Sequence, residues 1–282
     1  MSKRNNAKRA STPSANNVTM PPQMAATSAY QAPTEFVKIP SGGRFYPPEH
    51  PFHNVEEVEI KLMTAKEEDI LASKSLLAKG IMIDRFIESV LIDKSVRADS
   101  LLAGDRNAIM LVARNTGYGS DYLTKVTCPS CSKVSEYTFD LSEYKIVNPE
   151  DVSQYGLHQT ERGTFTYEAK MSKAILEVKL LDGDAEKFLT RLSQSKVANN
   201  LPESTLTDFL KMIIVSVNGD ANRATVESYV DNMPALDSKR LRTAYNKINP
   251  SIDLSKDFHC PMCNTVTQLE VPLSADFFWP KL

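Results

Sequence analysis

The chain has 282 residues, of which 41% are hydrophobic and 24% are charged, and its formal net charge is −2. This composition is typical of a globular protein with one large domain or two smaller ones. The charge argues against a global basic field that binds nucleic-acid phosphates. The apolar run from Met212 to Val217 is too short to cross a bilayer, and no apolar segment follows the basic N-terminus as in a secretion signal. We therefore expect a cytosolic protein with reduced thiols.

Residues 1–35 are predicted to form a disordered basic arm. Small polar residues, proline and methionine dominate this segment, which has almost no large aliphatic side chains to bury. Its first ten residues include Lys3, Arg4, Lys8 and Arg9. Such an arm is either a solvated tail or a segment that becomes ordered on an acidic partner surface or on nucleic acid.

Residues 36–145 are predicted to form an α+β domain that begins with a small sheet. Phe36–Ile39 has the composition of a strand, and glycines and prolines over 41–48 indicate turns. The sequence "VEEVEIKLM", residues 55–63, alternates apolar and charged side chains, which is typical of a half-exposed second strand.

Three helices are expected after this sheet. Thr64 and Glu67 form a capping-box pattern, which predicts a helix from Thr64 to about Lys79. A second amphipathic helix over 83–92 would bury four apolar side chains: Phe86, Ile87, Val90 and Leu91. A third helix is predicted over 105–115, with Asp105 as its N-cap and Gly117 beyond its end.

Residues 146–255 are predicted to form a mostly helical inserted domain with a β-hairpin. The stretches "GTFTYEAK" and "AILEVKLL" are typical of paired strands joined near residues 171–173. Asp182 or Asp184 is expected to cap a helix that runs through Leu192. The apolar stretch "ESTLTDFLKMIIVSVNG" predicts a helix ending at Gly219, and two further helices are expected near 223–232 and 237–247.

All four cysteines lie in two copies of one short motif. Cys128-Pro-Ser-Cys131 aligns with Cys260-Pro-Met-Cys263, and the alignment continues without a gap to a Leu-Ser pair in each copy. Four thiolates are a ligand set that zinc prefers in tetrahedral sites. We therefore predict a split zinc ribbon in which Cys128, Cys131, Cys260 and Cys263 hold one structural Zn²⁺ per chain.

The split ribbon carries two further expectations about the fold. Each strand after a knuckle would pack against its twin through apolar side chains: Val134, Tyr137 and Phe139 in one copy, and Val266, Leu269 and Val271 in the other. Residues 256–282, with the second knuckle and the C-terminal tail, would pack on the first domain. The middle region would then be an insertion whose two ends lie close together.

Two other interpretations of the cysteines remain open. The hairpins could pack without metal, or the cysteines could form a redox dithiol, although a redox motif is expected to open a helix after a buried strand. His259 could compete as a ligand, but four cysteines already fill a closed site. A closed site has no open position for water and is structural, not catalytic.

No other pattern predicts catalytic or cofactor-binding residues. His50 and His53 lie on a proline-bounded loop beside Glu49, where a surface turn is favoured over a metal site. Gly104-Asp105-Arg106 could bind a phosphate, but a helix cap with a neighbouring arginine is favoured. The acidic run 67–69 suits the first turn of a helix because of the helix dipole. We therefore expect a protein that is not an enzyme and has no small-molecule substrate.

Aromatic residues on loops and at the C-terminus are candidate contact residues. Phe45, Tyr46 and Tyr118 are flanked by glycine or proline, and they either cap the core or anchor a partner. Phe277, Phe278 and Trp279 lie at the end of the chain, and we expect them to dock on their own domain or on another subunit.

Several motifs, taken in order, resemble the baseplate hub and hub-assembly proteins of T-even-like bacteriophages. They are "IPSGGRFYP" (39–47), "MTAKEE" (63–68), "GDR" (104–106), "AR" (113–114), "YG" (118–119) and "CPSC" (128–131). The resemblance spans about residues 36–142 and does not cover the arm or the middle region.

This resemblance implies a structural or assembly protein of a contractile-tail baseplate. Its partners would be other phage baseplate hub proteins, and it would assemble in the host cytoplasm. The protein itself would have no membrane segment and no enzymatic activity. The alternative is a zinc-ribbon protein that binds nucleic acid in phage transcription or replication, which the acidic balance of the chain and the few basic residues near the knuckles disfavour. A third interpretation, an enzyme that uses the middle region, would require a convergent polar pocket.

Overall fold

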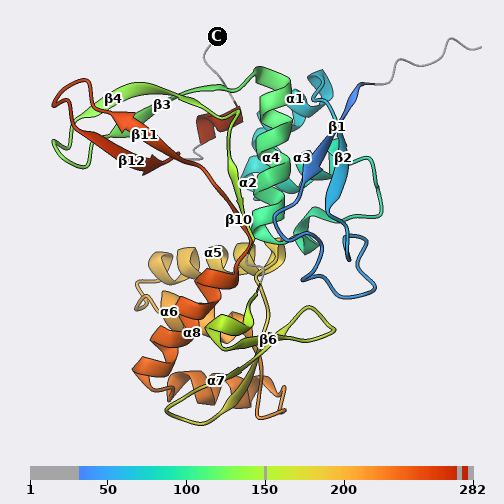
Figure 1. Ribbon diagram of the computed structural model, residues 1–282, viewed down its shortest axis with the longest axis vertical. Helices are drawn as coiled ribbons and strands as arrows, with labels where there is room; N and C mark the ends of the chain where they lie inside the picture. The colour runs from blue at the N-terminus through green and yellow to red at the C-terminus, as the bar shows by residue number, and fades with distance from the viewer. Residues whose placement is uncertain (1–31, 149–150, 272–274, 279–282) are drawn as a thin grey trace, which may run out of the picture. The chain divides into compact units, whose positions relative to one another are not determined.

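The computed structural model describes residues 32–148, 151–271 and 275–278. The predicted arm therefore lies almost entirely outside the described residues. The fold is α+β, with helices and several small antiparallel sheets (Figure 1). No helix in the described residues has the length and apolar character needed to cross a membrane.

The first sheet and the first helices match the predicted order. Strands β1 (Thr34–Lys38) and β2 (Glu57–Lys61) pair antiparallel, with Val37 opposite Val58. Helix α3 (Met82–Val90) buries Phe86, Ile87, Val90 and the following Leu91, as the amphipathic pattern predicts. The short 3-10 helix η1 (Ala98–Ser100) leads into α4 (Ala103–Tyr118).

The single helix predicted from Thr64 to Lys79 is wrong. The chain forms α1 (Ala65–Ala72) and α2 (Lys74–Ala78), separated by Ser73 in an extended conformation. The Ser73 side chain accepts a hydrogen bond from the Leu76 N–H and so caps the second helix. The capping box is confirmed, because Thr64 and Glu67 satisfy each other's backbone donors.

The predicted limits of the third helix are also wrong. Helix α4 begins at Ala103 and continues through Gly117 to Tyr118, and Gly119 ends it with a positive φ of 85°. Asp105 therefore lies inside the first turn and is not the N-cap. Its carboxylate instead binds the loop that precedes β2, as described below.

The middle region contains a larger sheet than the predicted hairpin. Strands β6 (Leu157–Gln159), β7 (Phe165–Glu168), β8 (Ile175–Val178) and β9 (Ile214–Val217) form an antiparallel sheet in that order. The predicted β7–β8 hairpin is confirmed. The short 3-10 helix η2 (Ser153–Tyr155) precedes β6.

Four helices complete this region, and the sequence predicted all four, although one of them ends earlier than predicted. They are α5 (Gly183–Ala198), α6 (Thr205–Ile213), α7 (Arg223–Asp231) and α8 (Ala235–Ile248). Asp182 caps α5 by accepting a hydrogen bond from Ala185 N–H at 2.8 Å. The helix predicted to end at Gly219 is wrong beyond Ile213, because Ile214–Val217 pairs with β8 as a strand. An apolar run this short cannot be assigned to helix or strand by periodicity alone.

The two ends of the middle region lie together, as the split ribbon predicts. Strand β5 (Lys145–Val147) lies at the start of this region, and β10 (Ser251–Asp253) lies near its end. They pair antiparallel, with Ile146 opposite Ile252. The chain thus leaves the first region and returns to it through one two-stranded ladder.

Candidate metal centre

The two cysteine motifs form loops with the same backbone hydrogen bonds. The first lies between β3 (Asp121–Thr127) and β4 (Val134–Asp140), and the second lies between β11 (Ser255–His259) and β12 (Val266–Glu270). In the first, Cys128 N–H donates to Lys133 O, and Ser132 N–H donates to Cys128 O. In the second, Cys260 and Asn264 make the two equivalent bonds.

The equivalence extends to backbone strain in each turn. Ser132 has φ 57° and Asn264 has φ 55°, both in the left-handed region that non-glycine residues seldom occupy. Both residues follow the second cysteine of their motif by one position. The internal repeat of the sequence is therefore a repeat of backbone conformation.

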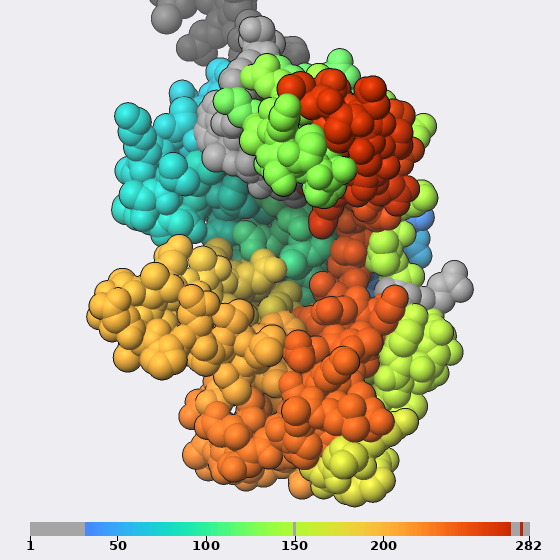
Figure 2. All heavy atoms as spheres, turned by 90° about the vertical axis from the view of Figure 1, so that its left-hand side faces the viewer, coloured from blue at the N-terminus to red at the C-terminus, as the bar shows by residue number. Residues whose placement is uncertain are grey.

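The four sulfur atoms meet in one cluster. Their Sγ atoms all lie within 4.8 Å of one another. Cys128 Sγ is 3.7 Å from Cys263 Sγ, and Cys131 Sγ is 3.8 Å from Cys260 Sγ, so each close pair joins the two motifs. Figure 2 shows the two hairpins, in green and red, packed against each other.

These distances fit a metal ion and do not fit a disulfide. Four ligands at a Zn–S distance of about 2.3 Å in a tetrahedron have sulfurs about 3.8 Å apart. A disulfide requires about 2.05 Å, and all four cysteines are free. The donor set and its spacing therefore allow a tetrahedral thiolate-bound metal ion.

Hydrogen bonds around the sulfurs favour the thiolate form at two of the four positions. The Thr265 hydroxyl and backbone N–H lower the pKa of Cys263 to about 6. The backbone N–H of Cys131 lowers the pKa of Cys128. Metal binding requires deprotonated sulfur, so these donors favour binding at Cys263 and Cys128. At Cys131, the Lys133 N–H is outweighed by burial and the neighbouring thiols, which raise the pKa to about 11. Backbone N–H donors in these turns are expected of a zinc knuckle, whereas the Thr265 hydroxyl was not predicted.

The hairpins also contact each other through aromatic side chains. The Tyr137 ring of β4 packs at 5.0 Å from the Phe258 ring of β11, and its hydroxyl donates to Asp257 O at 3.2 Å. Phe258 is fully buried. The contact thus joins β4 to β11, whereas the sequence predicted that the strands after the knuckles would pack as twins.

Several side chains assigned to that twin packing are exposed. Val134 is 61% exposed and Val266 is 58% exposed at equivalent positions of the two turns. Phe139 and Val271 are buried as predicted, and Leu269 packs partly against the core. His259 belongs to no metal-ligand cluster in the described part of the chain, where the cluster consists of the four cysteines.

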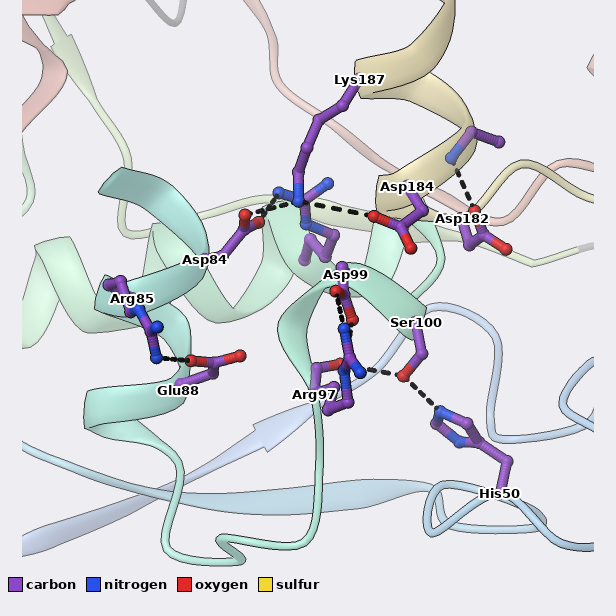
Figure 3. A network of polar contacts seen from close by, with 12 residues as sticks. His50, Asp84, Arg85, Glu88, Arg97, Asp99, Ser100, Asp182, Asp184 and Lys187 are labelled. Carbon is purple, nitrogen blue, oxygen red and sulfur yellow. Dashed lines mark hydrogen bonds and ion pairs between the residues drawn. The ribbon is translucent and has the colours of Figure 1, made fainter. Parts of the chain in front are cut away.

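The histidine pair on the first loop has structural contacts. The His50 ring stacks on Tyr46 at 4.3 Å, and its Nε2 is 2.9 Å from Ser100 Oγ, a contact drawn in Figure 3. His53 Nδ1 is 2.8 Å from Tyr46 O. These bonds fix the loop, as the surface-turn interpretation predicts.

Asp105 holds the same loop from the start of α4. Its carboxylate accepts hydrogen bonds from Ser41 N–H at 2.9 Å, Ser41 Oγ at 2.6 Å and Tyr46 hydroxyl at 2.7 Å. Burial raises the pKa of Asp105 against the effect of these donors. Phe45 and Tyr46 are buried, so they belong to the core. The "GDR" and "IPSGGRFYP" motifs thus meet in one structural contact.

A cluster of charged side chains joins the first region to α5, and we call it the polar junction. It consists of Asp84, Arg106, Glu186 and Lys187. Asp84 Oδ1 is 2.9 Å from Arg106 Nη2, and Asp84 Oδ2 is 2.5 Å from Lys187 Nζ. Figure 3 shows Lys187 reaching from α5 toward Asp84 on α3. No sequence pattern indicated this cluster, because its members come from three separate helices.

Backbone contacts accompany the polar junction. Leu102 and Asp182 form an isolated antiparallel bridge, and Gly183 N–H donates to Leu101 O at 3.0 Å. Gly104 allows Pro250 to approach closely, because a Cβ at this position would lie 2.1 Å from Pro250 O. All three residues of "GDR" therefore have structural contacts, and none of them is arranged around a phosphate.

Two of the three C-terminal aromatic residues that were predicted to dock are described by the structure, and both pack on the first region. Phe278 packs on Phe86 at 4.9 Å, and Phe277 packs on Tyr122 at 5.5 Å. The buried Arg114 guanidinium lies over both Tyr122 and Phe277. Tyr118, expected on a loop, lies in α4 and donates to Glu68 at 3.0 Å. Trp279 lies outside the described residues.

Comparison with known proteins identifies one family. The family model described as "T4 bacteriophage base plate protein" matches residues 32–279. Neither the curated proteins nor the solved structures gave a match. The matched residues include both cysteine motifs, the middle region and the polar junction. Because this match covers well over half of the chain, the protein belongs to the T4 bacteriophage base plate protein family.

Proposed function

We propose that the protein is a structural or assembly component of the central baseplate hub, held together by one zinc ion. Membership of the family supports a structural protein of the phage baseplate that contacts other baseplate proteins. The zinc ligands would be Cys128, Cys131, Cys260 and Cys263. The observation that carries the proposal is the tetrahedral spacing of these four sulfurs, which come from distant parts of the chain.

The donor set favours zinc among the metals that proteins bind. Thiolates are soft ligands, and a compact four-sulfur site suits zinc or an iron–sulfur centre. Two facing C-x-x-C turns that supply four thiolates are typical of structural zinc sites. Four cysteines fill the coordination of such an ion, so it would stabilise the fold without binding a substrate.

The zinc would join two parts of the chain that the middle region separates. We propose the division into 36–145, an inserted 146–255 and a returning 256–282, preceded by a basic arm that ends where β1 begins at Thr34. The β5–β10 ladder supports an insertion, because it brings its two ends together. The metal would then hold the returning segment on the first domain.

Contacts elsewhere support a structural role over a catalytic one. The carboxylates of Asp105 and Asp84 are engaged by buried partners, and the histidines of the first loop are held by ring and backbone contacts. These groups stabilise loops and helix ends. We propose that the protein assembles in the host cytoplasm with other hub proteins.

The proposal is tested by quantitative mass spectrometry of purified phage particles and of lysate from the same infection. A hub component is expected in particles at a few copies each. A hub-assembly factor is expected in isolated baseplate intermediates and not in finished particles. Absence from both fractions, together with salt-dependent binding to DNA, would contradict the proposal and favour a nucleic-acid-binding protein.

A further inference from the structure

A groove of about 990 Å³ lies in the middle region, between α8 and the edge of the four-stranded sheet. Its walls come from η2, β6, β7, the turn between β7 and β8, the start of β8, and α8 as far as Ala244. Figure 1 shows β6 and α8 in this part of the molecule. The metal centre and the polar junction contribute no residue to it.

The groove is strongly basic. Four of its lining residues are cationic, Lys170, Lys173, Lys239 and Arg240, whereas Glu168 is its one acidic lining residue. Glu168 lies 3.7 Å from Lys173. In the described part of the chain, no carboxylate lies within ion-pair distance of Lys170, Lys239 or Arg240. These three clustered cations thus form no ion pair in the described residues, and only the buried Asp237 carboxylate acts electrostatically on Arg240, although the chain as a whole has a net charge of −2.

The loop that carries two of these lysines is held in place. The carboxylate of Asp237, fully buried at the start of α8, accepts hydrogen bonds from Met171 N–H and Ser172 N–H, both at 2.9 Å. These bonds fix the loop 170–173 against the helix that carries Lys239 and Arg240. A preorganised groove loses less conformational entropy when it binds a partner.

Apolar side chains line the groove beside the charges. Ile175 is 57% exposed and Leu236 is 44% exposed. Of the aromatic lining residues, Tyr167 is buried and Tyr155 packs partly against the core. His158 is the one exposed ring among the lining residues, so the groove offers little surface for the base stacking that single-stranded nucleic-acid sites commonly use. Exposed aliphatic groups next to cations suit a peptide with acidic and apolar side chains.

We propose that this groove binds an acidic segment of a neighbouring baseplate subunit. Carboxylates of the segment pair with Lys170, Lys239 and Arg240, and its apolar side chains cover Ile175 and Leu236. The arm of this chain does not fit, because residues 1–31 contain basic residues but no aspartate or glutamate. The assignment of the segment to a baseplate subunit rests on the proposed function. The acidic and apolar character of the segment is inferred from the groove alone.

The test measures binding of a fluorescein-labelled, glutamate-rich peptide with interspersed leucines to the full-length protein, by fluorescence anisotropy at low salt. The groove variant is Lys239→Glu with Arg240→Glu. The matched control is Lys74→Glu with Lys79→Glu, which makes the same change of charge at exposed positions of the first region. The groove variant is expected to bind the peptide about tenfold more weakly or worse, and the control is expected to bind as the wild type does.

A second peptide keeps the test decisive if the groove variant is unstable. The same peptide with lysine in place of glutamate is expected to bind the groove variant more tightly than it binds the wild type and the control, whereas a misfolded variant would bind both peptides through their leucines. Equal affinity of the groove variant and the control for the acidic peptide would overturn the proposal. Tighter wild-type binding of a single-stranded DNA oligonucleotide than of the acidic peptide would also overturn it. Neither result depends on the protein content of phage particles. Failure of the groove proposal can therefore be distinguished from failure of the proposed hub role.

Discussion

The cysteine centre and the polar junction both join early and late parts of the chain, but they do so with different chemistry. The centre uses four identical side chains from two repeated turns, with sulfurs at the spacing of a metal tetrahedron. The polar junction uses a carboxylate between two cations from helices that share no pattern. A metal bound at the centre would join the segments with strong bonds, whereas buried ion pairs gain little beyond the cost of their desolvation.

The difference shows which long-range contacts a sequence reveals. A metal site imposes fixed residue types and fixed spacing within each turn, so each half is visible by itself. An ion pair between helices imposes no spacing on the chain. The predictions below test this contrast, in order of decreasing expected effect.

Loss of the metal is expected to have the largest effect. Cys260→Ser removes one thiolate from the cluster and should abolish zinc binding, because Cys260 is buried and the exposed side chain of His259 cannot replace it. Structural zinc contributes on the order of 10 kcal/mol in small zinc modules, so we expect a fall in melting temperature of more than about 10 °C. Differential scanning calorimetry with and without a zinc chelator measures it. An unchanged melting temperature in both experiments would show that the hairpins pack without metal.

Removal of the carboxylate at the polar junction is expected to lower the free energy of unfolding by less than loss of the metal, but still substantially. Asp84→Ala leaves Arg106 and Lys187 without this partner, at side-chain exposures of 10% and 20%. Breaking a buried pair in this way costs about 3–5 kcal/mol, measurable by urea denaturation. Asp184→Ala is the matched control, because Asp184 also faces Lys187 but is 71% exposed. A similar loss in both variants would remove the distinction between buried and exposed partners.

A third polar cluster, entirely within the first region, predicts a dependence on pH. Burial raises the pKa of Glu67, but hydrogen bonds from Lys61, Ser89 and Thr64 outweigh it and lower the pKa to about 2. A lowered folded-state pKa gives stability that is present above the unfolded value near 4.5 and is lost as the pH falls toward 2. In the wild type, we expect the free energy of unfolding to fall by roughly 2 kcal/mol over this pH range because of Glu67. This fall should be absent in Glu67→Gln.

The control for Glu67 is Asp69→Asn, at an exposed position of the same helix. Denaturation curves of both variants and the wild type are recorded from neutral to acidic pH. At each pH, the free energy of unfolding of each variant is compared with that of the wild type. Release of metal at low pH is common to all three proteins and cancels. A wild-type slope in the Glu67→Gln variant would show that another group controls acid stability.

The smallest effect is expected at the aromatic contact between the hairpins. Tyr137→Phe keeps the ring on Phe258 and removes only the hydroxyl bond to Asp257 O, which is exposed. We expect a loss of about 0.5–1 kcal/mol in the free energy of unfolding, with zinc content unchanged. A loss of zinc in this variant would mean that hairpin packing, not the metal, determines the sulfur geometry.

Local patterns predicted much of the fold. The capping box at Thr64, the amphipathic helix α3 and the β7–β8 hairpin depend on neighbouring residues and are confirmed. The repeat of the cysteine turns predicted which four side chains meet. Its consequence, that the ends of the middle region lie together, is confirmed by the β5–β10 ladder.

The errors occur where distant partners override local preference. Residues 214–217 form a strand because β8 offers an edge to pair with, which no local pattern contains. Asp105 has the sequence context of a helix cap, but Ser41 and Tyr46 take its carboxylate into the core. The break at Ser73 could have been predicted, because a serine three residues before Leu76 is itself a capping signal.

The most direct test of the account is the metal content of the full-length protein purified under reducing conditions. Native mass spectrometry should show one zinc ion per chain, and chelation should release it together with cooperative unfolding. The Cys260→Ser variant should have no zinc under the same conditions. A fully folded wild-type protein without metal, and with the same melting temperature as the chelator-treated sample, would contradict the claim that a metal ion joins the two cysteine motifs of this chain.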